Sequence, residues 1–274
     1  MSGTRPCCGG RSAIAAAATL LAAAVTVVAP AAAAPTAAAG TAGGAAGLAP
    51  SITVLAATSL TNVLPRITRA GVRYSFGGSD LLGAQIEQGA PADVFAAASP
   101  KAPEALHAQG LVEQPIVFAT NSLVLVVPAA NPAGLKSVYD VRRPGIKLLV
   151  GNAGVPIGAY TRQLLKSLGL GAALANAVSQ ETDPRSILGK VALGEADAGF
   201  VYATDARTAA GRVRVIPLPE RAQPPVRYVL AIVKSTRNRV AAVAFVNRVL
   251  GQAGQAALRR DGFGSPRPAP QAIS

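Results

Sequence analysis

The chain has 274 residues, of which 50% are hydrophobic and 4% aromatic, and its formal net charge is +13. This length and apolar content allow one large domain or two modest ones. Both cysteines, Cys7 and Cys8, lie near the N-terminus, which excludes disulfides and thiolate metal sites from the rest of the chain. The single histidine, His107, lies in a short polar helical stretch, where a solvated surface residue is expected rather than a catalytic one. The arginines are scattered and not interleaved with aromatic residues, which argues against nucleic-acid binding.

The N-terminal segment has the pattern of an export signal. Arg5 and Arg11 precede an uncharged, mostly apolar run at 13–29, and residues 31–39 offer several A-x-A cleavage sites. We predict a signal peptide over residues 1–39 and a flexible Gly- and Ala-rich lead-in over 40–50. An uncleaved anchor is the alternative, because about 17 apolar residues is the lower limit for a membrane span. No cysteine follows the apolar run, so a lipid anchor is not indicated, and we expect an exported protein of the periplasm or cell envelope.

The next part of the chain alternates between strand and helix patterns. Such alternation is typical of βαβ units and a parallel sheet, and it predicts an α/β fold. Apolar or alternating runs predict strands at 52–57, 72–76 and 93–97, and helical patterns lie at 63–67 and 81–88.

A longer apolar run at 121–128 predicts a strand that crosses from the first lobe to the second. We predict strands at 146–150, 198–202, 213–216 and 228–233, and helices at 159–168, 187–193, 240–250 and 253–259. The strand at 228–233 is expected to return to the first lobe. Gly169-Leu170-Gly171 follows a helix and lacks a third glycine, so we interpret it as a helix C-cap and not as a dinucleotide-binding loop.

Two serines, Ser59 and Ser79, follow predicted strands and precede predicted helices. Open α/β sheets bind ligands at the carboxyl ends of their strands. Helix N-termini there present free N–H groups and the positive end of the helix dipole, which favours anions. The alternative is that both serines are simple N-caps.

Five segments together resemble a known family. They are "AATSLTN" (56–62), "SFGGSDLLGAQIEQGAPADVF" (75–95), "NSLVLVVP" (121–128), "GVPIGAYTRQLL" (154–165) and "GEADAGFVYATDA" (194–206). In this order they are similar to periplasmic molybdate-binding proteins of the ModA type, and the similarity covers residues 51–264. The longest segments are the most specific.

The resemblance implies a two-lobed type II periplasmic-binding-protein fold with two crossing hinge strands. Each lobe is expected to be a mostly parallel sheet flanked by helices, with lobe I formed by 51–120 and 225–274 and lobe II by 121–224. The family implies capture of molybdate, and we expect tungstate too, for the permease of an ABC importer. It also implies a monomer without enzymatic activity or cofactor, in which molybdenum is bound only as the oxyanion and without direct protein ligands.

Carried over position by position, the resemblance assigns five ligand-binding residues. Ser59 and Ser79 would each give a hydroxyl and an amide, Ile157 in the loop before Gly158 an amide, and Tyr202 its phenol. A strand-end tyrosine packed on the hinge is the alternative for Tyr202.

The fifth position departs from the family pattern. The family uses a further amide where this chain has Pro184, and proline has no N–H to donate. Either Asp183 or Arg185 supplies that contact, or one donor is missing.

Three other functions are alternatives. A binding protein of the same fold for another oxyanion or small acid is the nearest. A serine hydrolase is disfavoured because no G-x-S-x-G motif is present. An interaction module that uses the basic surface would show salt-dependent binding to a polyanion.

Overall fold

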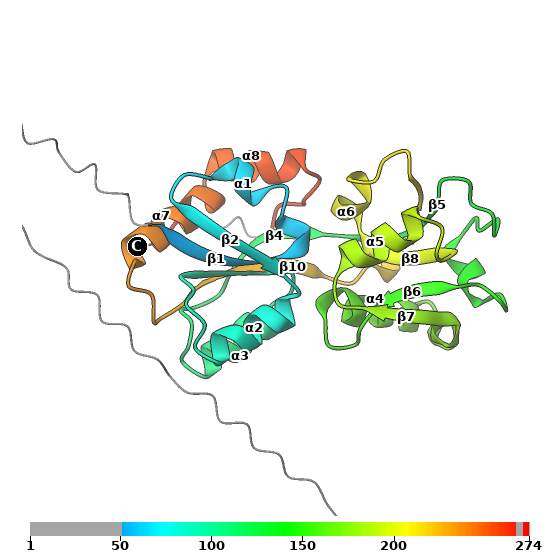
Figure 1. Ribbon diagram of the computed structural model, residues 1–274, viewed down its shortest axis with the longest axis horizontal. Helices are drawn as coiled ribbons and strands as arrows, with labels where there is room; N and C mark the ends of the chain where they lie inside the picture. Colours follow the sequence, from blue (N-terminus) through cyan, green and yellow to red (C-terminus); the bar gives the residue numbers. More distant parts are fainter. Residues whose placement is uncertain (1–50, 267–270, 274) are drawn as a thin grey trace, which may run out of the picture. The chain divides into compact units, whose positions relative to one another are not determined.

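The computed structural model describes residues 51–266 and 271–273, which form two five-stranded sheets with helices packed against them (Figure 1). The predicted signal peptide and lead-in, with Cys7 and Cys8, lie outside the described residues. Within those residues, no helix is long and apolar enough to cross a membrane.

The first sheet has the strand order β2-β1-β3-β10-β4. Strand β1 pairs in parallel with β2 and β3, whereas β10 is antiparallel to both β3 and β4, so β10 runs against the other four strands. The strands are β1 (Ile52–Ala57), β2 (Val72–Gly77), β3 (Val94–Ala97), β4 (Ile116–Asn121) and β10 (Val226–Ile232).

Helices pack on both faces of this sheet (Figure 1). Successive strand residues point to opposite faces, so Leu55 of β1 joins a small apolar cluster with Leu82 and Leu106, while Val54 faces the larger core. The helices of this part are η1 (Thr58–Leu60), α1 (Leu64–Ile67), α2 (Ser79–Glu87), α3 (Lys101–Ala108), α7 (Arg239–Leu250) and α8 (Gln252–Arg260).

The second sheet repeats the arrangement of the first. Its order is β7-β6-β8-β5-β9, with β6 parallel to β7 and β8 and with β5 antiparallel to β8 and β9. Its strands are β5 (Leu123–Pro128), β6 (Leu148–Gly151), β7 (Ala177–Glu181), β8 (Ala198–Tyr202) and β9 (Val213–Ile216). Its helices are η2 (Val138–Arg142), α4 (Pro156–Ser167), η3 (Gly171–Asn176), α5 (Pro184–Ala192), α6 (Ala203–Arg207) and η4 (Glu220–Ala222). The predicted two-lobed α/β architecture is confirmed.

The chain passes between the sheets twice, from β4 to β5 through Ser122 and from β9 to β10 through η4. The side-chain amide of Gln223 ties the two crossings together, because it accepts from the Leu123 N–H (2.9 Å) and donates to the Leu123 carbonyl (2.8 Å). We keep 51–120 with 225–274 as the proposed lobe I and 121–224 as the proposed lobe II.

The element boundaries differ from the sequence prediction at several points. The predicted strand at 121–128 is interrupted at Ser122, and β7 was not predicted because its residues alternate only weakly between exposed and half-buried positions at a sheet edge. Helices α2, α4 and α5 begin two or three residues earlier than predicted. Their first residues are serine and proline, which open a helix without contributing to its apolar period. Gly169 has a φ of 69° after α4, which confirms the C-cap interpretation.

Candidate functional site

A small cavity of about 20 Å³ lies where the carboxyl ends of parallel strands from both sheets meet. It is lined by Ala57, Thr58, Ser59, Gly77, Gly78, Ser79, Ala98, Val155, Pro156, Ile157, Thr182, Pro184 and Tyr202. These residues end or follow β1, β2 and β3 on one side and β6, β7 and β8 on the other. The structure thus brings all five sequence-predicted ligand-binding residues to one place.

Ser79 is the first residue of α2 and is 2% exposed. Its Oγ accepts a hydrogen bond from the Ala98 N–H (3.0 Å), which leaves the hydroxyl proton available to an occupant of the cavity. Its backbone N–H belongs to the first turn of the helix and has no intrahelical acceptor. The N-cap of α2 is Gly78 and not Ser79, so the simple-cap alternative is wrong for this serine.

Ser59 lies in η1, and its hydroxyl is oriented by a hydrogen-bond chain instead of capping a helix. Its Oγ is 2.8 Å from the Tyr228 hydroxyl, which in turn accepts from the Asn121 side-chain amide (3.3 Å). The Asn121 oxygen accepts from the Ser122 N–H (2.9 Å), so its nitrogen is the group that faces Tyr228. Either hydroxyl can be the donor in the Ser59–Tyr228 pair, but with Asn121 donating to Tyr228, donation from Tyr228 to Ser59 gives the Tyr228 proton an acceptor. This arrangement leaves the Ser59 proton for the cavity.

Sequence reasoning missed Tyr228 and Asn121. Tyr228 and Asn121 are the first residues of the predicted strands 228–233 and 121–128, but their contact joins positions 107 residues apart. The sequence carries no local signal for this contact. Burial raises the pKa of Tyr228, which keeps the phenol protonated and able to donate.

Tyr202 is the last residue of β8 and is 1% exposed. Within the described residues its hydroxyl has no hydrogen-bond partner. Its ring packs edge-on against Tyr228 of β10, the strand that follows the second crossing between the sheets, with 5.9 Å between the ring centroids. Tyr202 therefore packs near the hinge and also lines the cavity. Burial, with Tyr228 adding to it, raises the pKa of Tyr202 well above its ordinary value, so this phenol is a proton donor.

Ile157 is the second residue of α4, and not part of a loop as predicted. The amides of the first helical turn have no intrahelical acceptors and carry the positive end of the dipole. This turn sits tightly on the end of β6, because a Cβ at Gly158 would lie only 1.9 Å from the Asn152 carbonyl. Glycine at position 158 therefore allows the turn to face the cavity.

Pro184 opens α5 and contributes its ring, but no donor, to the cavity wall. The Asp183 carboxylate caps the helix and accepts from the N–H groups of Arg185 (2.9 Å) and Ser186 (3.1 Å). The Arg185 amide is therefore already used. The geometry favours the alternative in which one of the family's donors is missing.

A long ion pair between half-buried Arg185 and buried Asp205 lies outside the cavity lining. Arg185 Nε is 3.9 Å from Asp205 Oδ1, and Asp205 is 1% exposed. Burial raises the Asp205 pKa to about 7, Arg185 offsets part of this rise and Asp183 adds to it. Among the described residues that line the cavity, none carries a charged side chain.

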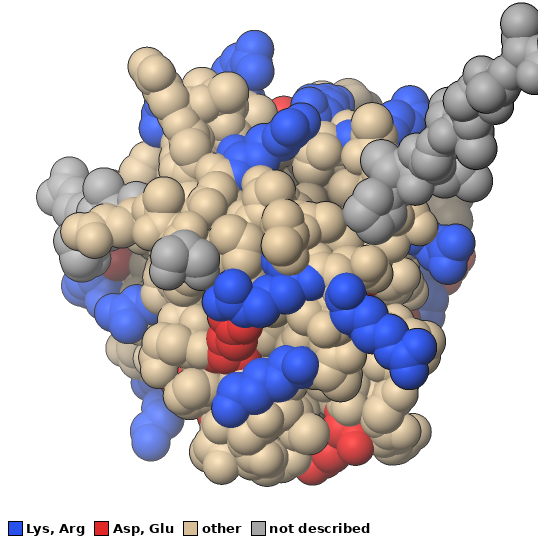
Figure 2. Space-filling view, turned by 90° about the vertical axis from the view of Figure 1, so that its left-hand side faces the viewer, with Lys and Arg blue, Asp and Glu red and all other residues tan. Residues whose placement is uncertain are grey.

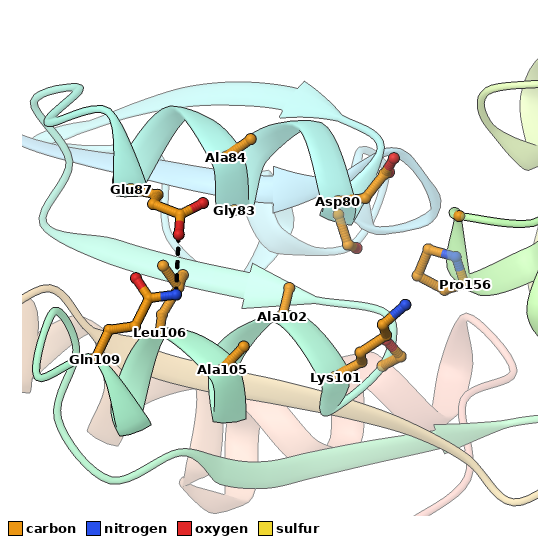
Figure 3. Close-up of a pocket in the computed structure, with 13 residues that line it drawn as sticks. Asp80, Gly83, Ala84, Glu87, Lys101, Ala102, Ala105, Leu106, Gln109 and Pro156 are labelled. Atoms are coloured by element: carbon orange, nitrogen blue, oxygen red, sulfur yellow. Dashed lines mark hydrogen bonds between the residues drawn. The ribbon is translucent and has the colours of Figure 1, made fainter.

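A larger hollow of about 210 Å³ lies between α2 and α3 and shares Ser79 with the cavity (Figure 3). Its ends are charged, with Asp80 and Lys101 near Pro156 and a Glu87–Gln109 hydrogen bond (2.9 Å) at the far end. The walls between them are small side chains, namely Gly83, Ala84, Ala102 and Ala105. Because these walls offer no converging donors, we do not assign the ligand to this hollow.

Outside the cavity, the functional groups of the described residues that remain are the histidine, possible metal ligands and the surface charge. His107 is half-buried, with Nδ1 3.1 Å from the Val112 carbonyl, and it does not line the cavity. No group of three or more His, Cys, Asp or Glu side chains within the described ranges could hold a metal ion. On the face shown in Figure 2, basic side chains are interspersed with uncharged and acidic ones.

An uncharged, donor-lined cavity between two α/β lobes defines a solute-binding protein. The family described as bacterial extracellular solute-binding protein matches residues 41–264, and the chain belongs to this family. Its relatives are binding proteins, so this chain is a solute-binding protein and not an enzyme.

Within that class the chain belongs to the ModA-type family, as the sequence resemblance predicted. It is 37% identical over 227 residues to the molybdate-binding protein ModA of Mycobacterium tuberculosis H37Rv, covering 80% of this chain and 86% of that protein. It is 32% identical over 227 residues to ModA of Escherichia coli K12, covering 77% and 88%. The solved periplasmic molybdate-binding protein of Azotobacter vinelandii superposes with a TM-score of 0.71 at 26% identity, covering 79% of this chain and 100% of that chain.

Proposed function

We propose that this protein captures molybdate, and also tungstate, outside the cytoplasm and presents it to the permease of an ABC importer. The observation that carries the proposal is the small cavity in which Ser59, Ser79, Ile157, Pro184 and Tyr202 meet without a charged side chain. The names of the relatives support the same ligand.

Hydroxyl and amide groups that can donate hydrogen bonds line this cavity. Transfer of a dianion from water is very costly unless its oxygens are hydrogen-bonded. Hydroxyls of Ser59, Ser79 and Tyr202, with amides at Ser79 and Ile157, offer five donors, and a hydrogen bond to a charged group contributes about 1.5–3 kcal/mol. The buried Tyr202 hydroxyl in particular lacks a partner until an acceptor arrives.

Size and charge favour a small inorganic oxyanion. Organic ligands occupy pockets of about 300–1,000 Å³, more than ten times the volume of this cavity. No carboxylate or other charged acceptor lines the cavity, so the wall favours a fully ionised oxyanion over a protonated one. Rigid donors would contact a smaller ion such as sulfate less well.

The proposal extends to the cellular role. Residues 1–39 would direct export, no cofactor would be needed, and a monomer that closes around the ion would be recognised by the permease in its closed form. We expect no nucleic-acid binding, because the arginines are scattered and not interleaved with aromatic residues.

Isothermal titration calorimetry of the protein lacking residues 1–39 against molybdate, tungstate, sulfate and phosphate tests the ligand. We expect saturable one-to-one binding of molybdate and tungstate and little heat from sulfate. Binding of another anion, with no heat from molybdate or tungstate, would refute the ligand assignment and leave the fold intact.

One observation favours a second candidate, a binding protein of the same family for another oxyanion or small acid. Pro184 supplies no N–H where the family uses an amide, and Asp183 occupies the amide of Arg185. A ligand with fewer acceptors on that side would suit this site, and the same anion panel would reveal it.

A further inference from the structure

A second, polar pocket of about 390 Å³ borders the cavity on the side of α1, α6 and α8. It is lined by Ser59, Asn62, Arg66, Thr204, Arg207, Thr208, Arg260, Asp261 and Phe263. Ser59 lines both the pocket and the small cavity, so the two spaces adjoin at this residue. Residues of both proposed lobes form the pocket, since Thr204, Arg207 and Thr208 come from lobe II.

The pocket carries an excess of positive charge. Arg66 pairs with Asp261 at 2.8 Å, which neutralises one of its three arginines. Arg207 and Arg260 are exposed, and neither guanidinium makes a hydrogen bond or ion pair within the described residues. Two uncompensated guanidinium groups therefore face a solvent-filled space next to Ser59.

The outer pocket and the inner cavity differ in whether they can hold a hydrated or only a dehydrated anion. The outer pocket is large enough for an anion with part of its hydration shell, whereas the inner cavity of about 20 Å³ admits only a dehydrated one. Charged groups attract hydrated anions over a Debye length of about 10 Å, while neutral donors act only in contact. The arginines of the outer pocket would therefore attract the anion, and the neutral donors of the inner cavity would hold it.

We propose that this pocket is a vestibule in which Arg207 and Arg260 collect a hydrated dianionic oxyanion and pass it to Ser59. This inference rests on the proposed function, since it assigns the route of the same ligand. Positive potential in a pocket raises association rates by about 10- to 1,000-fold at low ionic strength. Because the arginines do not line the inner cavity, they act on the association rate and not on the dissociation rate.

Stopped-flow association of molybdate, followed through tyrosine fluorescence, tests the vestibule, since the chain has five tyrosines and no tryptophan. We expect Arg207→Gln/Arg260→Gln to lower the association rate constant about tenfold at low ionic strength and to leave the dissociation rate within about twofold. The wild-type rate should fall steeply with added salt, and the variant rate should depend on salt much less.

Two further variants complete the test. Arg207→Lys/Arg260→Lys keeps the charge and should retain most of the wild-type rate, even though Arg207 also packs against Gly262. Arg73→Gln/Arg142→Gln removes two exposed charges that line neither space and should leave the rate nearly unchanged.

The outcomes separate the vestibule from the function itself. An unchanged association rate in the Arg207/Arg260 variant, or an equal loss in the Arg73/Arg142 variant, would overturn the vestibule while molybdate binding stands. A normal rate combined with lost uptake through the importer would assign the two arginines to a protein partner and would also overturn it. Failure of the wild-type protein to bind any oxyanion would remove the proposed function and the vestibule together.

Discussion

The hydroxyl of Ser59 is useful to an anion only if its proton points into the cavity. A hydroxyl can donate or accept, and its environment decides which. With Asn121 donating to Tyr228, donation from Tyr228 to Ser59 is the arrangement that gives the Tyr228 proton an acceptor, so two residues outside the cavity orient the hydroxyl of a third inside it.

Tyr228→Phe should therefore weaken oxyanion binding although Tyr228 does not line the cavity. Loss of one neutral hydrogen bond, worth about 0.5–1.5 kcal/mol, predicts an affinity about 2- to 12-fold lower by calorimetry. Ser59→Ala, which removes the donor itself, should cost more, and combining the two changes should add little to Ser59→Ala. Additive losses would contradict the hydrogen-bond chain.

Tyr202→Phe should separate binding from stability. The Tyr202 hydroxyl is buried without a partner in the absence of ligand, so its removal should leave the free energy of unfolding unchanged or raise it. With ligand, the lost charge-assisted hydrogen bond should lower affinity by about 10- to 150-fold. Urea unfolding and calorimetry measure the two quantities, and Ser79→Ala should lower affinity by a similar factor. A clear loss of stability in ligand-free Tyr202→Phe would contradict the assignment.

Asp205 should make stability depend on pH. Burial raises its pKa from 3.8 to about 7 in the folded state, so the unfolded chain loses this proton first as pH rises. The Asp205 contribution to stability is therefore complete below pH 3.8, falls by at most about 1.4 kcal/mol per pH unit up to about 7, and is constant above. The Asp205→Asn variant has no carboxyl group at this position and should not show this decline. The difference in free energy of unfolding, variant minus wild type, should therefore increase between pH 4 and pH 7. Parallel pH profiles for the two proteins would refute the shift.

At the scale of elements, the site is built from helix N-termini that approach strand ends closely. Helices α2, α4 and α5 each begin beside the cavity, and their first residues are Ser79, Pro156 and Pro184. The amides of α2 and α4 remain available, whereas Asp183 caps α5 and so uses the amides next to the proline. One helix therefore closes the cavity without supplying a donor.

Gly158→Ala should weaken both binding and folding. A Cβ at this position would lie 1.9 Å from the Asn152 carbonyl and 2.4 Å from the Gly151 carbonyl, so the first turn of α4 would have to move away from β6. We expect at least a tenfold loss of affinity and a lower melting temperature. Gly189→Ala in α5 meets no atom within 4 Å and is the matched control. It should keep affinity and gain up to about 1 kcal/mol from helix propensity, and equal effects of the two substitutions would contradict the packing argument.

At the scale of the whole folded part, the two lobes meet in a closed arrangement. A Cβ at Gly78 of lobe I would lie 3.0 Å from the Thr182 carbonyl of lobe II, so the backbones nearly touch at the cavity. Since the ligand would contact both lobes, its binding free energy should add to the stability of the folded protein.

Molybdate should therefore raise the melting temperature. At 100 times the dissociation constant the ligand contributes about 2.7 kcal/mol, which corresponds to roughly 5–10 °C for a protein of this size. Differential scanning calorimetry with equal concentrations of sulfate serves as the control for ionic strength. Equal shifts with both anions would indicate general salt stabilisation and not occupation of the cavity.

The sequence by itself predicted the α/β class, the family, most of the strands and helices and the five residues that the structure brings to one cavity, but it did not predict β4, β7 or α6. Strand and helix periods are local, and the family motifs lie in continuous segments such as those that contain Ser79 and Tyr202. Only the tertiary structure decided the contacts between distant segments. These include the path from Asn121 through Tyr228 to Ser59, the burial of Asp205 beside Arg185, and the pocket that Arg207 and Arg260 share. No local pattern encodes them, because packing of the two lobes determines which of the many polar side chains lose water and which partners they meet.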